Sequence, residues 1–372
     1  MGMEKQKQNI KPQLALSMIN GLGAQKITRL IRHFKEPEKI FDSTPKELTR
    51  IDGIGIGIAK QILNFKDWNR VDKIIEYAEK SDVWLLTQTD EQYPERLRHI
   101  YDPPILLWGR GNKNALSTKG IAIIGTRKPS PYGRDAAERF SKKLVNNGLS
   151  IFSGLAYGID TIAHRTTVEQ KGTTVAVLGS GIDRIYPDAN RKLAERIIEN
   201  NGAIVTEFVP GTKPDAGNFP VRNRIVSGLS LGVLVVESAD TGGSMITVGS
   251  ALDQGREVFV IPHSLNNTAG AGCNSIIKRG HGKLVQNLQD ILSELSINLQ
   301  QKNKVEHQPK WKQVELSIEE CALCEAIGKE TIHIDTLAEK TGIPGHSILV
   351  SLLQLELKGC VKALAGKHFQ LV

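Results

Sequence analysis

Short apolar runs alternate with stretches of helical length through the middle of the chain. The runs lie at residues 121–124, 150–152, 174–178, 203–205, 232–236 and 258–261. This alternation predicts right-handed βαβ units and a parallel sheet that helices cover on both faces. Two further runs, at 83–86 and 104–109, predict strands that lead into this domain. We therefore expect an α/β domain over residues 81–297.

A repeat of glycine, apolar residue and glycine marks the first part of the chain. Gly21-Leu22-Gly23 and Gly53-Ile54-Gly55 each separate two helical patterns, which predicts a tandem helix-hairpin-helix module within residues 1–80. Glycine lets backbone N–H groups approach a phosphate at the positive end of the following helix. The first hairpin is followed by the cations Lys26, Arg29 and Arg32. Contact with DNA and simple packing or protein contact are equally open interpretations of this module.

The end of the chain forms a separate pattern after a polar, aperiodic stretch at 298–312, which predicts a linker. Three helical patterns and a hairpin follow, at 317–327, 334–340, 344–357 and 361–372. This order predicts a winged-helix domain over residues 313–372. The domain carries more acidic than basic residues, and its third helix has no arginine to read the DNA major groove. We therefore favour protein contact over DNA reading for this domain.

Composition and charge narrow the class of protein. The chain has 372 residues and a net charge of +8, from 48 basic and 40 acidic residues, which suits a polyanionic partner. No apolar run approaches the roughly 18 to 20 residues that span a bilayer, so we expect a cytoplasmic protein without a membrane partner. Cys321 and Cys324 form a CxxC pair, but no further ligands follow at metal-binding spacing. We expect two half-buried helix cysteines, and no metal ion or cofactor.

The segment 219–230 carries the strongest sign of a binding site. Phe219 and Pro220 precede the cluster Arg222-Asn223-Arg224, and the apolar run at 232–236 follows. In an open α/β sheet, the loops at the carboxyl ends of the strands form the binding crevice. We place these residues on such a loop, where cations and an aromatic ring face the ligand. The expected ligand is an anion with flat rings, a nucleotide or a nucleic-acid strand.

Three other segments add cations or exposed amides to the same edge. Gly125-Thr126-Arg127-Lys128 follows the first strand of the domain, and Ser130 is placed to cap the next helix. Gly243-Ser244 opens a later helix, and Arg191-Lys192 opens another. Turns and helix faces that point to solvent are the alternative interpretation of these cations. Together the anion pockets and cation clusters exceed what one nucleotide needs, and they suit an extended phosphate backbone.

Acidic residues and a histidine near the strand ends raise the question of catalysis. Asp160 and His164 are four residues apart and share a helix face, while Glu207 and Glu237 each end a strand. A helix cap with a histidine bonded to it explains the first pair without catalysis. No nucleophile with its base is evident, so we expect no catalytic residue. The stretch 179–184 begins like a dinucleotide-binding fingerprint but has arginine in place of its third glycine, so no dinucleotide cofactor is expected.

Taken in their order along the chain, these motifs make the sequence resemble the DNA processing protein A family, also called DprA or Smf. The motifs lie at 125–127, 153–164, 186–190, 219–224, 243–247 and 255–259. The resemblance covers nearly the whole chain and implies an extended Rossmann domain that binds single-stranded DNA without sequence preference. It also implies protection of incoming strands in natural transformation, loading of RecA recombinase, and a homodimer formed through the C-terminal part of the Rossmann domain.

The resemblance also implies roles for individual residues. It places Arg127 and Arg222-Asn223-Arg224 on DNA phosphates, and Phe219 near a base. The full set of expected nucleic-acid-binding residues is Gly125, Thr126, Arg127, Lys128, Gly154, Arg191, Lys192, Phe219, Arg222, Asn223, Arg224, Gly243 and Ser244. The sequence departs from the family at two points. No basic residue directly precedes Phe219, and Pro262-His263 stands where the family usually has Pro-Gly.

The competing class is an enzyme, a Rossmann-like hydrolase of nucleoside monophosphates. Such enzymes carry a Pro-Gly-Gly-x-Gly-Thr loop with a following glutamate. This chain has Thr241-Gly242-Gly243-Ser244-Met245 instead. We therefore expect a binding protein rather than an enzyme. A nucleotide-hydrolysis assay beside a gel shift with oligo-dT separates the two classes.

Overall fold

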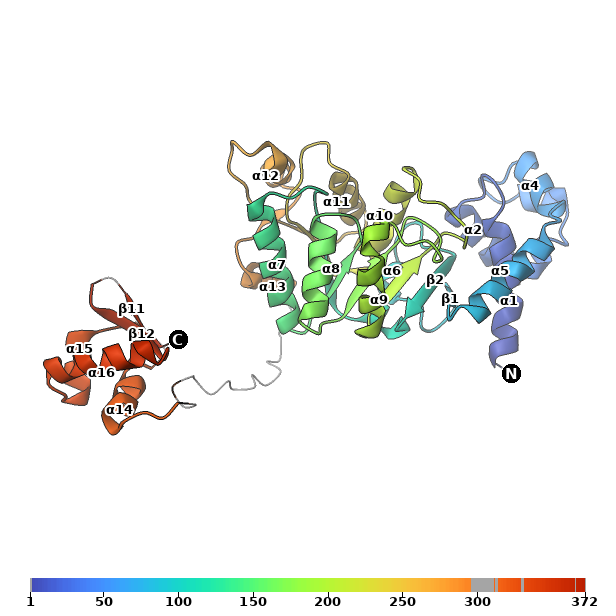
Figure 1. Ribbon diagram of the computed structural model, residues 1–372. Helices are drawn as coiled ribbons and strands as arrows, with labels where there is room; N and C mark the ends of the chain where they lie inside the picture. Colours follow the sequence, from blue (N-terminus) through green and yellow to red (C-terminus); the bar gives the residue numbers. More distant parts are fainter. Residues whose placement is uncertain (1, 296–310, 312–313, 329–330, 365, 372) are drawn as a thin grey trace. The chain divides into compact units, whose positions relative to one another are not determined.

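The computed structural model describes residues 2–295, 311, 314–328, 331–364 and 366–371. It divides into two compact units, Met1–Asn298 and Leu299–Val372 (Figure 1). The expected linker at 298–312 lies outside the described residues, except for Trp311.

A nine-stranded sheet forms the centre of the larger unit as far as it is described, in the order β1-β2-β6-β5-β4-β3-β7-β8-β9. Its strands are β1 (Trp84–Thr87), β2 (Leu106–Gly111), β3 (Gly120–Ile124), β4 (Ser150–Ser153), β5 (Thr174–Val177), β6 (Ala203–Thr206), β7 (Gly232–Val235), β8 (Glu257–Val260) and β9 (Lys283–Leu284). Every strand predicted from an apolar run is present. Neighbours from β6 to β9 pair in parallel, as expected. By contrast, β2 pairs antiparallel with both β1 and β6, so the first two strands give the parallel sheet an antiparallel edge.

Helices cover both faces of this sheet (Figure 1). One layer contains α7 (Pro131–Asn146), α8 (Ile159–Glu169), α9 (Arg191–Glu199) and α13 (Leu288–Glu294); the other contains α6 (Glu95–Arg98), α10 (Asn218–Leu229), α11 (Ser244–Asp253) and α12 (Ala271–Lys278). Short 3₁₀ turns are η2 (Lys113–Ser117), η3 (Asp188–Asn190) and η4 (Thr268–Gly270). Successive side chains of a strand point to opposite faces. Accordingly, Val175 and Val177 of β5 join the core beneath α10 and α11, and Ala176 joins the core beneath α9.

The segment 219–230 is helical for most of its length, and the expectation of a loop there was wrong. Helix α10 begins at Asn218, so Pro220 lies in its first turn. Proline is tolerated there because the first N–H groups of a helix have no partner within the helix. The consequence is that the side chains from Phe219 to Arg224 are distributed around a helix, and they do not all face one ligand.

Six helical segments precede the sheet in the described part of the chain. They are α1 (Gly2–Ser17), α2 (Ala24–Phe34), η1 (Pro37–Ile40), α3 (Pro45–Thr49), α4 (Ile56–Leu63) and α5 (Trp68–Lys80). Their buried residues, such as Leu30 and Ile62, share one core with Trp108 of β2. The two glycine hairpins face each other. The Nζ of Lys26 donates to the carbonyl of Gly21 at 3.0 Å, and the guanidinium of Arg29 pairs with Asp52 of the second hairpin. Lys26 therefore closes the first hairpin, and Arg29 connects the two hairpins.

The smaller unit has the winged-helix outline that the sequence predicts. It contains α14 (Ile318–Ile327), α15 (Ile334–Thr341), α16 (Gly345–Leu357) and a sheet of β10 (Ile332–His333), β12 (His368–Leu371) and β11 (Val361–Leu364) in that order. Cys321 is half-buried and Cys324 buried, and burial raises the pKa of the Cys324 thiol to about 12.

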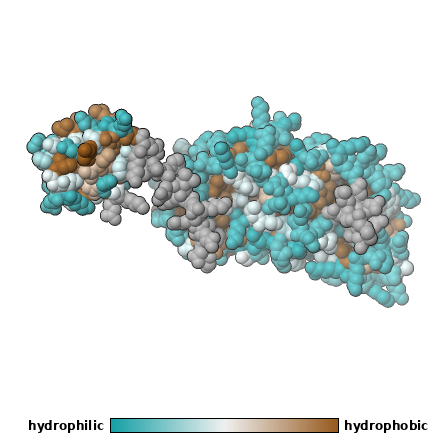
Figure 2. Space-filling model, turned by 90° about the horizontal axis from the view of Figure 1, so that it is seen from below, coloured by the Kyte–Doolittle hydropathy of each residue, from teal (hydrophilic) through white to brown (hydrophobic). Residues whose placement is uncertain are grey.

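Hydrophobic residues reach the surface of this smaller unit, whereas the larger unit is mostly hydrophilic in the same view (Figure 2). On α16 the exposed apolar side chains are Leu349, Val350, Leu353 and Leu357. Such a surface suits contact with a protein better than contact with DNA phosphates. No helix among the described residues of either unit is long and apolar enough to cross a membrane.

Candidate nucleic-acid interface

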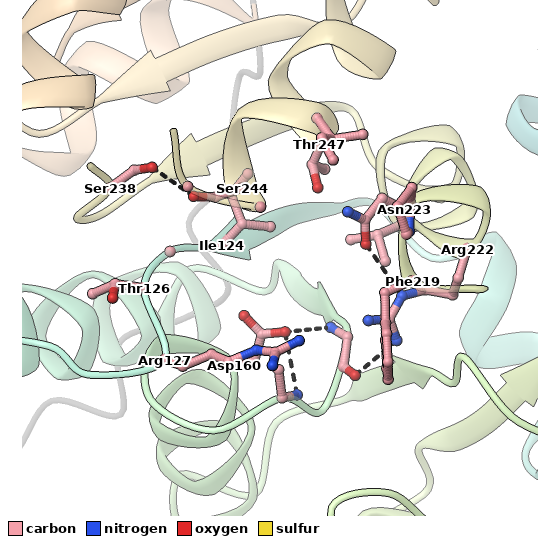
Figure 3. Close-up of a pocket in the computed structure, with 18 of the residues that line it drawn as sticks. Ile124, Thr126, Arg127, Asp160, Phe219, Arg222, Asn223, Ser238, Ser244 and Thr247 are labelled. Carbon is pink, nitrogen blue, oxygen red and sulfur yellow. Dashed lines mark hydrogen bonds between the residues drawn. The ribbon is translucent and has the colours of Figure 1, made fainter. Parts of the chain in front are cut away.

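A cavity of about 440 Å³ opens at the carboxyl edge of the sheet (Figure 3). The loops after β3, β4 and β7 and the first turns of α10 and α11 surround it. Most of the site residues expected from the sequence line this cavity: Gly125, Thr126, Arg127, Lys128, Gly154, Phe219, Arg222, Asn223, Gly243 and Ser244. Segments that are far apart in the sequence are thus brought together because the carboxyl ends of parallel strands meet at one edge.

The loop after β3 is fixed by the end of β7. The N–H of Thr126 donates to the carbonyl of Glu237 at 2.7 Å, and the N–H of Ser130 donates to its carboxylate at 2.8 Å. Ser130 also caps α7, as the sequence predicts, by accepting from the N–H of Gly133 at 3.1 Å. The side chain of Glu237 is completely buried. Glu237 is therefore a fixed support beneath Thr126 to Ser130 and does not face the cavity.

A buried ion cluster forms the floor of the cavity. The carboxylate of Asp160 accepts from the N–H groups of Gly154 at 3.0 Å and Ala156 at 3.4 Å. Arg222 is only 4% exposed, and its guanidinium donates to the carbonyl oxygens of Gly154, at 2.8 Å, and Val177. A Cβ atom at position 154 would lie 2.6 Å from Nη2 of Arg222, so this turn requires glycine.

The charge of Arg222 persists despite its burial. Burial lowers the pKa of its guanidinium to about 10, while the negative charge of Asp160 opposes that effect and Arg127 adds to it. Burial likewise raises the pKa of Asp160, against the influence of Arg222. At neutral pH the guanidinium is therefore protonated, and it lies near the carboxylate of Asp160 in the floor of the cavity.

The ring of Phe219 is half-buried at the side of the cavity. The guanidinium carbons of Arg127 and Arg222 lie 5.5 and 5.8 Å from its centroid, within the range of cation–π attraction. The ring also packs on Gly179, where a Cβ atom would lie 2.8 Å from the phenylalanine ring. Tyr186 is a further aromatic neighbour, with its ring centroid 5.8 Å away. Phe219 is thus held in position by its surroundings without belonging to the closed hydrophobic core.

The mouth of the cavity carries free cations and open backbone. Arg127 and Lys128 are exposed, and neither forms an ion pair with a described residue. On the opposite side, α11 begins after Gly243, and no atom lies within 4 Å of the place that a Cβ would take there. Ser244 adds a hydroxyl that is hydrogen-bonded to Ser238 at 2.7 Å. Exposed cations and a helix N-terminus together attract an anion.

Three of the expected residues do not line this cavity. Arg224 lies on another side of α10, is 8% exposed, and pairs with Asp102 at 2.8 Å and Glu207 at 2.6 Å. Burial alone would lower the pKa of its guanidinium, but the two carboxylates outweigh burial and raise it. Arg191 pairs with Asp188 at 2.8 Å and lines a separate cavity beside α9. Lys192 is exposed on the same helix.

The acidic residues considered for catalysis are dispersed. Glu207 pairs with Arg224 and Glu237 supports the loop after β3. His164 is bonded through Nδ1 to the hydroxyl of Thr174 at 2.7 Å, and burial lowers the pKa of its imidazole to about 3. Asp160 instead accepts backbone amides. Among the described residues, no group of three or more histidine, cysteine and acidic side chains is arranged to hold a metal ion.

The expected binding residues do not include Ser238 and Thr247, which also line the cavity, although Thr247 lies within the motif at 243–247. Ser238 directly follows Glu237 near the end of β7, and Thr247 lies one turn into α11. The sequence could have indicated both residues, since one follows a predicted strand and the other lies at the start of a predicted helix.

A family model described as DNA recombination-mediator protein A matches residues 84–296, which is the sheet domain that carries this cavity. The chain belongs to the DNA processing protein A (DprA/Smf) family. Two further models match the flanking regions of the chain. One is described as the DprA winged helix domain, over residues 308–367, and the other as a SAM-like helix-hairpin-helix tandem, over residues 14–65.

Curated relatives match the chain over half of its length or more. Protein Smf of Escherichia coli is 34% identical over 363 residues, which are 96% of this chain and 95% of that protein. DNA processing protein DprA of Streptococcus pneumoniae is 42% identical over 205 residues, 55% of this chain and 72% of that protein.

Solved structures of family members share the fold. DprA of Streptococcus pneumoniae superposes with a TM-score of 0.64 and 34% identity, over 74% of this chain and 94% of that one. DprA of Helicobacter pylori gives a TM-score of 0.52 and 31% identity, over 57% of this chain and 95% of that one. The Helicobacter structure is described as showing a unique single-stranded DNA binding mode.

Proposed function

We propose that the cavity at the carboxyl edge of the sheet binds single-stranded DNA. The observation that carries this proposal is that free cations, open helix amides and a fixed aromatic ring line one cavity. Arg127 and Lys128 contact phosphates, as do the amides at Gly243 and Ser244. A base stacks against Phe219.

Recognition of this kind does not depend on base sequence. Phosphate contacts position a strand but carry no sequence information, and stacking accepts every base because each has a π face. The structure of the Helicobacter relative supports the same ligand class. The family further supports a cytoplasmic protein that protects incoming strands during transformation and loads RecA recombinase onto them.

The proposed function includes a homodimer formed through the C-terminal part of the sheet domain. The short edge strand β9 lies there, and Leu284 is 41% exposed on it. Light scattering on the full chain measures the oligomeric state. RecA activity is measured on single-stranded DNA coated with a single-strand-binding protein, before and after this protein is added. An increase measures the loading of RecA onto the DNA. A monomer, or no effect on RecA, would refute the respective part of the proposal.

The binding proposal is tested by fluorescence anisotropy with labelled oligo-dT, a mixed-sequence strand and a duplex of equal length. We expect similar affinities for the two single strands and a weaker affinity for the duplex. Neutralising about four to six phosphates gives a slope of log K against log salt of roughly −3 to −4 for single strands. A slope near zero, or tighter binding to duplex, would contradict the proposal.

The same preparation tests the alternative of a nucleoside monophosphate hydrolase. Asp160 is the acidic side chain in the cavity lining, and backbone amides occupy its carboxylate. We expect no release of base or ribose phosphate from a panel of nucleoside monophosphates. Turnover that Asp160→Asn abolishes would support the enzyme instead.

A further inference from the structure

A second cavity, of about 470 Å³, lies on the larger unit between the N-terminal helices and the start of the sheet domain. Helices α1 and α2 contribute one wall, and the segments after β1 and around the end of α6 contribute the other. Gln88 connects the two walls, since its amide lies 3.4 Å from the hydroxyl of Thr28 and donates to the carbonyl of Pro103 at 2.9 Å. The cavity is therefore part of one packed unit.

Gln13 supplies a side-chain amide to the wall of this cavity. This residue of α1 is 3% exposed. A primary amide offers one acceptor and two donor hydrogens, the pattern that pairs with the edge of a nucleobase. The buried amide therefore points to a ligand with base-like hydrogen-bonding groups.

The cavity walls are basic. Arg32 is exposed and forms no ion pair within the described part of the chain. Arg29 pairs with Asp52 yet keeps 42% of its side chain exposed, and Arg98 pairs with Glu95 with 34% exposed. Three arginines against two carboxylates leave a net positive charge. An anionic ligand is therefore favoured.

An aromatic ring stands at the same cavity. Tyr101 is 82% exposed, unlike the buried Tyr93 nearby in the sequence. The adjacent Asp102 pairs with Arg224 of α10, which fixes the segment that carries Tyr101. Helix α10 also carries Phe219 and Arg222 of the first cavity. Helix α10 thus carries residues of the first cavity and, through Arg224, holds the segment that carries Tyr101 of the second.

We propose that this second cavity is a nucleotide subsite for the same DNA strand, which continues over α10 from the first cavity. The base stacks on Tyr101 and pairs with the amide of Gln13, while its phosphate lies at Arg32. The subsite rests on the proposed function of the first cavity. It assigns a role to the N-terminal module that does not involve its glycine hairpins, whose cations Lys26 and Arg29 already bind Gly21 and Asp52.

The test compares strand lengths. Binding of labelled oligo-dT of about 6 and about 25 nucleotides is measured for the full chain. Single-strand-binding sites of OB folds span about 4 to 16 nucleotides, so the short strand fills one site and the long strand can reach a second. In Tyr101→Ala we expect the affinity for the long strand to fall about tenfold and that for the short strand to stay the same. Tyr101→Phe keeps the ring and should bind both strands like the unmodified protein. Arg32→Ala should reduce the salt slope for the long strand by about 0.7.

Arg50→Ala removes an exposed arginine of the same helical region that does not line the cavity, and it should change neither affinity. Unchanged binding of the long strand by both Tyr101→Ala and Arg32→Ala would overturn the subsite, as would an equal loss for both lengths. Saturable binding of free dTMP that Tyr101→Ala abolishes, with long-strand affinity intact, would show a mononucleotide site and also overturn it. If the unmodified protein binds neither strand, the proposed function itself fails.

Discussion

Basic side chains are exposed at the mouth of the first cavity but buried on the helix beside it. At the mouth, Arg127 and Lys128 are exposed and form no ion pair with a described residue. On α10, Arg222 and Arg224 are 4% and 8% exposed and bind carbonyl oxygens or carboxylates of the protein. In the sequence the two clusters look equally suited to DNA. Burial distinguishes a cation that is available to a phosphate from one that stabilises the helix presenting the site.

This distinction has an energetic basis. A buried ion pair broken on one side leaves an uncompensated charge and destabilises by about 3 to 5 kcal/mol. An exposed cation has little effect on stability, yet it displaces counterions from DNA when it binds a phosphate. Substitutions at the two places should therefore change different measurements.

The largest effect is expected for Arg224→Ala. It leaves the buried Glu207 without its partner, so the free energy of unfolding should fall by about 3 to 5 kcal/mol. Urea denaturation followed by circular dichroism measures this. Full stability together with weaker binding of oligo-dT would show instead that Arg224 serves the DNA.

Two glycines of the cavity give a matched pair. Gly154→Ala places a Cβ 2.6 Å from Arg222 and 2.9 Å from Asp160, and such overpacking costs about 1 to 3 kcal/mol of stability. Gly243→Ala places its Cβ in open space and should leave the melting temperature unchanged. Equal melting temperatures for the two variants would mean that the floor is less tightly packed than described.

Phe219→Leu keeps most of the apolar volume and removes the π face. Affinity for oligo-dT should fall about tenfold, which is about 1.4 kcal/mol, at unchanged stability. Anisotropy titration and a thermal melt of the same sample test both parts. Unchanged affinity would exclude Phe219 from the binding site, and a large loss of stability would assign it to the core.

The smallest effect is expected for Arg127→Ala. One lost phosphate contact should weaken oligo-dT binding about fivefold, roughly 1 kcal/mol, and reduce the salt slope by about 0.7. Lys142→Ala removes an exposed cation of α7 that does not line the cavity and serves as the control. If both variants reduce the slope equally, the cavity is not the specific contact for the strand.

The strands and the edge at which the site lies were predictable because they depend on local apolar runs and on a general property of parallel sheets. The start of α10 was not, since Gly217 and Pro220 resemble a loop until the proline is placed in a first helical turn. The burial of Arg224 was not predictable either, because its partners Asp102 and Glu207 are distant in the sequence. The position of Gln13 in the wall of the second cavity likewise results from tertiary packing, which no local pattern encodes.

The loop after β3 is ordered before DNA binds, because the N–H groups of Thr126 and Ser130 donate hydrogen bonds to Glu237. Binding of a DNA strand there therefore requires no prior ordering of this loop. The rate of association should then be governed by diffusion and by attraction to the exposed arginine and lysine, and it should fall steeply as salt increases. The lifetime of the complex, by contrast, should depend on how well a base remains stacked on Phe219.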